Sequence, residues 1–407
     1  MTVRIITGDV FDGLAQLPDC SVHCVVTSPP YWRLRDYQVA GQIGQEPTIE
    51  AHIDVMVRVF REVRRVLRSD GTLWLNYGDM WANDGKWGGS SSGKHVSDLH
   101  GKSGIGRAKV STGLKPKDLV MMPHRIALAL QADGWWVRDD IVWHKPNPMP
   151  ASVTDRCTPA KEYVFLMTKA ARYFYDADAI SEPAVYGEPN APDKNKSPTG
   201  QGFTRRASMN DVSAVPPGTA LHRGLATRRS ESAGDAGNGA TRNRRNVWSI
   251  ATEPYPEGHF ATMPTELARL CILAGTSEKG CCRDCGAPWK RIVDAAFQAQ
   301  HDAPGSHVRG DGDQKPLDAS SNWDGFPRGT TSRKTIGWEP TCSHAHVPTI
   351  RAVVLDPFGG AGTTGLVADR LQRDAVLIEL NPGYVSDHIK RRIAKDRGPL
   401  FAEEVAE

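Results

Sequence analysis

Two short polar segments, each directly after an apolar run, contain the residues best suited to chemistry. The first is Thr27-Ser28-Pro29-Pro30-Tyr31-Trp32, which follows the apolar run 22–27. Two consecutive prolines hold the chain extended and remove two backbone donors. The hydroxyl of Ser28 and the carbonyls of Ser28 and Pro29 are then left as acceptors beside the ring of Tyr31. This set suits a planar base that carries an amino group, although SPPY alone is also typical of a proline-rich turn after a strand.

The second segment is Asp356-Pro-Phe-Gly-Gly-Ala-Gly-Thr-Thr-Gly365, between the apolar run 350–355 and the helical run 366–371. Glycines at such a turn let the backbone approach a ligand and present helix N-terminal amides to it. No lysine follows the glycines, so a phosphate loop is not indicated. Glu379 lies near the end of the next apolar run, where a carboxylate can accept both hydroxyls of a ribose. The glycine turn and Glu379 together predict a site for a nucleoside-bearing cofactor. The alternative is that the glycines serve only the packing of a strand-to-helix turn.

A sheet must position these two turns, and the chain alternates apolar with amphipathic runs accordingly. Strands are expected at 22–27, 72–77, 136–144, 162–168, 350–355 and 375–380, and helices at 53–67, 124–132 and 265–274. Continuous apolar runs such as 350–355 are typical of a parallel sheet that is covered on both faces. The pattern therefore predicts an α/β fold.

Composition excludes two classes of protein. The 407 residues are 39% hydrophobic and 24% charged, with a net charge of +3 and eight cysteines. No apolar run approaches the roughly 20 residues that cross a bilayer, and MTVRIITGDVFDGL lacks the apolar segment of a signal peptide. Membrane and secreted proteins are therefore excluded, and a cytoplasmic protein with reduced thiols is expected.

SPPYW and DPFGGAGTT together resemble the amino-methyltransferases of DNA, which methylate cytosine N4 or adenine N6 with S-adenosylmethionine. SPPY precedes DPFGGAGTTG in this chain, the order of the circularly permuted β group of that family. The resemblance implies a Rossmann-like methyltransferase fold with a mostly parallel seven-stranded sheet, circularly permuted and with flexible insertions. It also implies double-stranded DNA as the partner, a bacterial or phage-infected cell as the setting, and a partner restriction endonuclease as a further expectation.

The same resemblance assigns site residues. The base pocket is expected from Ser28, Pro29, Pro30 and Tyr31, with Trp32 as a second aromatic ring. The cofactor is expected to contact Asp9, Phe260, Pro264, Asp356, Phe358, Gly359, Gly360, Gly362, Thr363, Thr364, Glu379 and Asn381. A plain Gly-Asp turn remains an equal interpretation of Asp9. The helix that follows Pro264 would direct its N-terminus at the methionine carboxylate.

A base inside the duplex must be flipped to reach this pocket. Serine at the first position of SPPY favours cytosine N4, because adenine enzymes of the family more often have Asp or Asn there. Adenine N6 is the alternative, since both amines need only acceptors. An RNA or protein methyltransferase on the same fold, and a DNA-binding protein without catalysis, are the remaining possibilities.

Three polar stretches, 83–117, 183–246 and 299–334, are expected to be flexible insertions, because they contain too few apolar residues to offset their ordering entropy. They divide the chain into a catalytic half (1–182), a basic region (183–246) and a cofactor-binding half (247–407). The basic region has ten Lys or Arg against five Asp or Glu. This excess suits phosphate contact and groove recognition, with a solvated insert as the alternative.

Cys282-Arg-Asp-Cys285-Gly is a C-x2-C-G turn of the kind that holds zinc. Cys342 and His344 offer a second half far downstream, so that a zinc knuckle would span 281–346. His346 could replace His344, and Cys281 could replace Cys282. A structural zinc ion is therefore expected beside S-adenosylmethionine, and free reduced thiols are the alternative.

Overall fold

The computed structural model describes residues 2–34, 36–37, 39–82, 112–151, 153–183, 241–255, 262–299, 329–344 and 347–398. Compact packing divides the chain into one unit of 1–181, 243–294 and 334–407, and another of 182–242 and 295–333. Most of each expected insertion (83–111, 184–240 and 300–328) lies outside the described residues.

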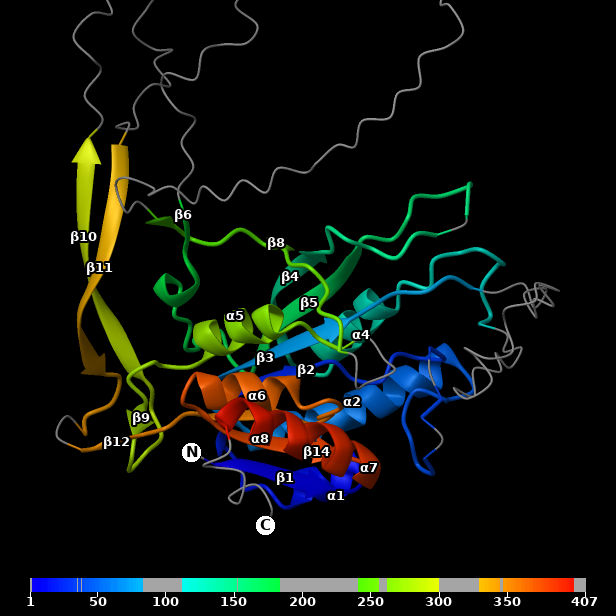
Figure 1. Cartoon of the computed structure of the whole chain (residues 1–407), viewed down its shortest axis with the longest axis horizontal. Coiled ribbons are helices and arrows are strands. Elements are labelled where there is room, and N and C mark those ends of the chain that lie inside the picture. The colour runs from blue at the N-terminus through cyan, green and yellow to red at the C-terminus, as the bar shows by residue number, and fades with distance from the viewer. Residues whose placement is uncertain are drawn as a thin grey trace, which may run out of the picture. The chain divides into compact units, whose positions relative to one another are not determined.

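The first unit is built on a sheet of eight strands (Figure 1). Their order is β1 (Val3–Thr7), β14 (Asp374–Glu379), β13 (Val353–Asp356), β2 (Val22–Thr27), β3 (Leu67–Tyr77), β5 (Lys161–Thr168), β4 (Trp136–His144) and β8 (Val247–Ser249). Neighbouring strands are parallel except where β5 pairs antiparallel with β3 and with β4. The β13–β2–β3 part therefore brings three carboxyl ends to one edge of the sheet.

Alternation along the strands distributes side chains between two cores. In β2, Val25 packs in one core while Cys24 and Val26 pack in the other, as the period of two requires. The first core is completed by α1 (Val10–Ala15), α2 (Ile49–Val66) and α4 (Met122–Ala132). The second is completed by α5 (Thr265–Gly275) and α6 (Thr363–Arg370), which lie side by side (Figure 1). The sheet is thus covered on both faces, as predicted.

The remaining described elements are short turns of helix and small strand pairs. They are η1 (Asp178–Ile180), α7 (Pro382–Tyr384), η2 (Val385–Lys390), α8 (Arg391–Arg397), and the pairs β6 (Glu182–Pro183) with β7 (Thr241–Arg242), β9 (Cys281–Cys282) with β12 (Thr349–Ile350), and β10 (Trp289–Ala299) with β11 (Gly329–Pro340). Within the described ranges, no helix is long and apolar enough to span a bilayer.

Every predicted strand and helix has a counterpart, although several bounds and the number of strands differ. The run 350–355 is not one strand, because Ile350 pairs with Cys281 in β9 while Val354 and Leu355 join the main sheet. The main sheet has eight strands rather than seven, since the short β8 adds to β4. Helix α2 begins four residues earlier than 53 because Thr48 caps it, accepting a hydrogen bond from the Ala51 amide at 3.1 Å.

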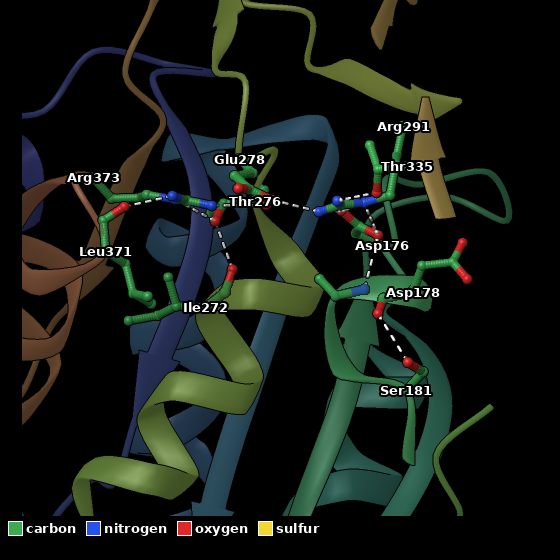
Figure 2. Close-up of polar contacts among 11 residues, drawn as sticks. Asp176, Asp178, Ser181, Ile272, Thr276, Glu278, Arg291, Thr335, Leu371 and Arg373 are labelled. Atoms are coloured by element: carbon green, nitrogen blue, oxygen red, sulfur yellow. Dashed lines mark hydrogen bonds and ion pairs between the residues drawn. The ribbon is translucent and has the colours of Figure 1, made fainter. Parts of the chain in front are cut away.

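A polar network ties the β10–β11 pair to the core (Figure 2). The Arg291 guanidinium donates to Asp176 and, at 2.7 Å, to Glu278. It also donates to the Thr335 hydroxyl at 2.8 Å, so it links both strands of the pair. Nearby, the buried Arg373 donates to the Thr276 hydroxyl at 3.1 Å. Charge-assisted bonds of this kind hold Arg291, near the start of β10, in one position.

Candidate active site

The two predicted segments meet at the carboxyl ends of adjacent strands. β2 and β13 pair in parallel, with Val25 opposite Leu355. The Thr27 hydroxyl donates to one carboxyl oxygen of Asp356 at 2.7 Å, and the Thr364 hydroxyl donates to the other at 2.7 Å. Residues of both segments line a single cavity. The diproline corner and the glycine turn therefore share one pocket.

Asp356 holds these two turns together. Its side chain is buried, and burial raises the pKa of this carboxyl to about 7. The hydroxyls of Thr27 and Thr364 and the Phe358 amide donate to it and oppose that shift. These bonds link Asp356 to residues of both turns.

On the β2 side, the cavity contains a connected set of polar side chains. The Tyr31 hydroxyl donates to Glu162 at 2.9 Å, and the Ser28 hydroxyl lies 3.3 Å from that of Tyr31. Lys145 forms an ion pair with the other oxygen of Glu162. Burial and the Glu162 charge raise the pKa of Tyr31 well above its usual value, so the phenol remains a donor.

Asn76, near the end of β3, is the most informative member of this set. Its side-chain amide donates to Tyr31 at 3.0 Å and to Glu162 at 3.2 Å. Among the described residues, none donates a hydrogen bond to the side-chain oxygen Oδ1, although Asn76 is only 3% exposed and lines the cavity. A buried acceptor without a donor is costly unless a ligand satisfies it.

The aromatic wall is provided by one tyrosine of the SPPYW segment. The Tyr31 ring packs against Tyr77 with centroids 4.5 Å apart. Gly78 makes room for it, since a Cβ there would lie 2.8 Å from the Tyr31 ring. Trp32 does not share this role, because its ring is buried and its Nε1 donates to the Glu46 carbonyl at 2.9 Å.

A second cavity adjoins the first, and Ser28, Phe358 and Gly360 line both. Glu379 lines it at the end of β14, where its carboxylate accepts the Gly360 amide at 2.7 Å and the Asn381 amide at 2.9 Å. Burial raises the pKa of Glu379, while the two amides oppose the shift. A carboxylate has about four lone-pair sites, so two such bonds leave acceptors for a pair of hydroxyls.

Asp9 fits both of its predicted interpretations. It lines the second cavity, and it also caps α1 by accepting the Phe11 amide at 2.8 Å. Beside it, Gly8 has a φ of +147°, a left-handed conformation that favours glycine. The turn therefore brings a carboxylate to the cavity rim close to the end of β14, because the Gly8 amide donates to the Glu379 carbonyl at 2.9 Å.

Most of the predicted residues of the pocket line one or both cavities: Asp9, Ser28, Pro29, Pro30, Tyr31, Asp356, Phe358, Gly359, Gly360, Thr363, Glu379 and Asn381. Gly362 and Thr364 do not, since Gly362 precedes α6 and Thr364 binds Asp356. Pro264 also lies outside the lining, whereas Thr262 and Met263 belong to it. Phe260 lies outside the described residues.

At the N-terminus of α5, the chain itself already binds the first residue of the helix. The Thr265 amide and hydroxyl donate to the Glu253 carboxylate at 3.0 and 2.7 Å. Glu253 itself lines the first cavity. The chain thus supplies its own anion to this helix end.

Several lining residues were missed by sequence reasoning: Tyr37, Asn76, Glu253, Tyr255, Tyr384 and His388. Asn76 had a detectable signal, as a lone amide side chain inside the apolar run TLWLNY. The others lie in loops or in the turns after β14, where neither a hydrophobic periodicity nor a sequence motif indicates a role in a site. The four predicted metal ligands gather elsewhere in the fold, and none lines either cavity.

A mostly parallel sheet whose carboxyl edge joins a nucleoside-type carboxylate site to an amide- and hydroxyl-lined pocket defines a Rossmann-like S-adenosylmethionine-dependent methyltransferase fold. The pattern of the N6/N4 DNA methylase family matches residues 22–286 and 346–391. The chain therefore belongs to this family of DNA methylases and is an S-adenosylmethionine-dependent DNA methyltransferase.

Individual relatives agree with this assignment. Type II methyltransferase M.SmaI of Serratia marcescens is 34% identical over 394 residues, which cover 97% of this chain and 91% of the relative. Type II methyltransferase M.Cfr9I of Citrobacter freundii is 32% identical over 389 residues, covering 96% and 87%. The solved PvuII DNA methyltransferase (cytosine-N4-specific) has a TM-score of 0.50 at 14% identity, over 99% of this chain and 91% of that one, which is a likeness of fold.

Proposed function

We propose that the enzyme methylates the exocyclic amine of a base flipped out of double-stranded DNA, with cytosine N4 favoured over adenine N6. The observation that carries this proposal is that Ser28, Pro29, Tyr31 and Asn76 line one cavity together with the glycine turn. Hydroxyl and carbonyl acceptors beside an aromatic ring suit a planar ligand that brings N–H donors. Serine rather than Asp or Asn before the two prolines supports cytosine.

The acceptors would act on the geometry of the amine. The lone pair of an exocyclic amine is conjugated into the ring, which makes the nitrogen a poor nucleophile. Hydrogen bonds from its two N–H groups to Ser28 Oγ and the Pro29 carbonyl favour a pyramidal nitrogen with a free lone pair. S-adenosylmethionine supplies an electrophilic methyl group when it is bound. Most of the catalysis is then positioning, as in other transfers between held reactants.

The second cavity fits the nucleoside part of that cofactor. Glu379 and Asp9 offer carboxylates for hydroxyl and amine hydrogens, and Phe358 and Ile378 offer apolar surface for a flat ring. The amides of Gly360 and Asn381 hold the Glu379 carboxylate in place. These contacts support the proposed cofactor role of the residues that line the cavity.

The Lys145–Glu162–Tyr31 chain would fix the aromatic wall of the base pocket. Tyr31 is fixed at its hydroxyl by Glu162 and on one ring face by Tyr77. Its other surface remains available to stack a flipped base. Lys145 balances the charge of Glu162, so the carboxylate does not repel the electron-rich edge of the base.

We propose further that the basic region 183–246, most of which lies outside the described residues, recognises the DNA sequence, and that a partner restriction endonuclease cuts the same unmethylated sequence. The relatives named above are type II methyltransferases. Cellular DNA as substrate would place the enzyme in the cytoplasm of a bacterial host.

The product tests this proposal directly. DNA incubated with the enzyme and methyl-labelled S-adenosylmethionine is hydrolysed to nucleosides, which are separated and counted. Label in N4-methylcytosine is the expected result. Label in N6-methyladenine would overturn the base assignment, and unlabelled DNA with labelled protein or RNA would overturn DNA methylation. Sequencing the methylated DNA then identifies the target sequence.

Ser28→Ala tests the proposed acceptor. We expect methyl transfer to fall about 100-fold or more, as for the loss of one catalytic hydrogen-bonding group, with the cofactor Kd unchanged. Ser21→Ala is the matched control, because that hydroxyl contacts only the Pro18 carbonyl among the interactions described. An equal loss of cofactor binding in Ser28→Ala would contradict the assignment of the base pocket.

A further inference from the structure

Four soft side chains converge at a point that the catalytic cavities do not use. The ligand atoms of Cys282, Cys285, Cys342 and His344 all lie within 4.8 Å of one another. The Cys282 Sγ and the His344 Nδ1 are 3.8 Å apart. A tetrahedral zinc ion with Zn–S bonds of about 2.3 Å and Zn–N bonds of about 2.0 Å separates its ligand atoms by roughly 3.5–3.8 Å. The cluster is therefore close to the dimensions of a Cys₃His zinc site.

The backbone around the first pair of cysteines forms a tight turn. The Cys282 amide donates to the Ala287 carbonyl at 2.8 Å, and the Gly286 amide donates to the Cys282 carbonyl at 2.8 Å. Gly286 has a φ of +71°, and a Cβ there would lie 2.5 Å from Arg68. Only glycine suits that position, so the C-x2-C-G spacing has a structural cause.

The structure also selects between the candidate ligands. Cys281 and Cys282 are consecutive residues of β9, so their side chains point to opposite faces. Cys282 belongs to the cluster and Cys281 does not. On the other side, His344 belongs to it, and His346 lies outside the described residues. The two halves are separated in sequence by β10 and β11 and are brought together by the β9–β12 pair, in which Cys282 is opposite Thr349.

The cluster lies against the amino ends of the parallel strands. His23, at the start of β2, accepts the Val353 amide on Nδ1 at 3.0 Å, and its Nε2 therefore carries the proton that is donated to the Gly286 carbonyl at 3.0 Å. Arg68, in β3, donates to the Cys285 carbonyl at 2.8 Å. Arg68 is also paired with Asp70, so this ion pair lies beside the turn that carries Cys285.

We propose that Cys282, Cys285, Cys342 and His344 bind one structural zinc ion that fixes the chain entering β13. All four positions of the tetrahedron are filled by protein, which is typical of structural rather than catalytic zinc. The site is at the opposite strand ends from Ser28 and Asp356. Its role is to hold β12 and the start of β13 against β2 and β3, and Arg291 near the start of β10 is separately bonded to Asp176 and Glu278 (Figure 2).

Metal content tests the proposal in the full-length protein. Protein purified without a metal-affinity tag should contain one zinc per chain by inductively coupled plasma mass spectrometry. Cys285→Ser and Cys342→Ser should each reduce this to less than about 0.2. Cys20→Ser and Cys157→Ser are matched controls, because both cysteines are exposed and outside the cluster, and they should retain one zinc.

A second measurement keeps the proposal testable if the ligand variants do not fold. Wild-type protein loaded with Co²⁺ should show the visible bands of a tetrahedral ion and the near-ultraviolet charge-transfer bands of cobalt–thiolate bonds. Chelation should lower the Tm of the wild type. Wild-type protein with no zinc, no cobalt–thiolate bands and an unchanged Tm in chelator would overturn the site, as would a Cys282–Cys285 or Cys285–Cys342 disulfide in its place. None of these outcomes depends on which base is methylated.

Discussion

The two ends of strands β2, β3 and β13 carry polar clusters of opposite character. At the carboxyl ends, Ser28 and Asn76 line a cavity, and no group in the described part of the chain donates to the Asn76 Oδ1. At the amino ends, both ring nitrogens of His23 are bonded, and Arg68 binds Asp70 and the Cys285 carbonyl. The first cluster leaves hydrogen-bonding capacity for a ligand, whereas the second uses it to hold the fold.

This difference shows how the two ends of one sheet can have different tasks: one end binds ligands, and the other stabilises the fold. Buried polar groups cost free energy unless they are satisfied. A protein tolerates an unsatisfied acceptor where a substrate will later bind it, and satisfies the rest internally. Changes at the carboxyl ends should therefore affect turnover and ligand binding, and changes at the amino ends should affect stability.

The largest expected effect is on turnover. Asn76→Ala should lower kcat about 100- to 1000-fold, since it removes the free acceptor and the support of Tyr31. Its cofactor Kd should stay within about threefold, because Asn76 does not line the second cavity. Steady-state methyl transfer and calorimetric titration measure the two quantities.

Gln131→Ala is the control for this variant, because Gln131 is an exposed amide residue of α4 that lines neither cavity. A normal kcat in Asn76→Ala would remove the contrast between the two strand ends.

Glu379→Gln should weaken cofactor binding about 10- to 100-fold, which is about 1.4–2.7 kcal/mol. The carboxamide has one acceptor oxygen, so its amino group would face one of the two amides that Glu379 now accepts. Titration with S-adenosylmethionine measures the Kd. The exposed Glu50→Gln in α2 should leave it unchanged, and matched Kd values in the two variants would exclude Glu379 from the cofactor site.

At the amino ends, Arg68→Ala should lower the free energy of unfolding by about 1–3 kcal/mol, because it leaves the Cys285 carbonyl without its donor and breaks the pair with Asp70. The kcat of the folded fraction should not change. Urea denaturation measures the stability.

Arg61→Ala removes a more exposed pair with Asp133 and should cost less than about 1 kcal/mol. An equal loss in both variants would mean that Arg68 is an ordinary surface arginine and that the knuckle is not anchored through it.

A further prediction concerns pH. Asp356 has a folded pKa of about 7, above its unfolded value of about 3.9. The folded state therefore keeps this proton between pH 4 and 7 while the unfolded state releases it. The stability that it contributes is present below pH 4 and is lost as pH rises through 7.

Asp356→Asn removes this dependence. The stability of the variant relative to the wild type should therefore improve as pH rises from 4 to 7, by no more than about 1.4 kcal/mol per pH unit. Urea denaturation at several pH values measures it, with the exposed Asp12→Asn as control. Parallel curves for wild type and Asp356→Asn would show that Asp356 ionises normally.

Sequence reasoning was strongest where a pattern has a direct geometric consequence. A glycine turn after one strand and a diproline corner after another had to meet if the strands were parallel neighbours, and β2 and β13 are. The C-x2-C turn and the Cys-x-His pair, about sixty residues apart, were predicted to form one site because thiolates and imidazole are typical zinc ligands. The structure brings those four side chains together. The bound metal itself stays a prediction.

Features that depend on packing against distant segments were harder to predict. Trp32 sits next to Tyr31 in sequence, yet it packs in the core because its indole nitrogen finds the Glu46 carbonyl. The run 350–355 reads as one strand, but its first residue pairs with β9. No local sequence pattern predicts that Glu253 binds the N-terminus of α5. Each outcome is decided by a partner far away in sequence.

The pairing of β1 with β14 has a consequence for synthesis on the ribosome. Val3 lies opposite Ala375 and Thr7 opposite Glu379, so the two carboxylates of the second cavity, Asp9 and Glu379, come from opposite parts of the chain. An emerging polypeptide cannot assemble that cavity until residue 379 has left the exit tunnel. Strand β1 cannot pair with β14 before residues 374–379 have been synthesised. We therefore expect the cofactor to bind after translation rather than during it.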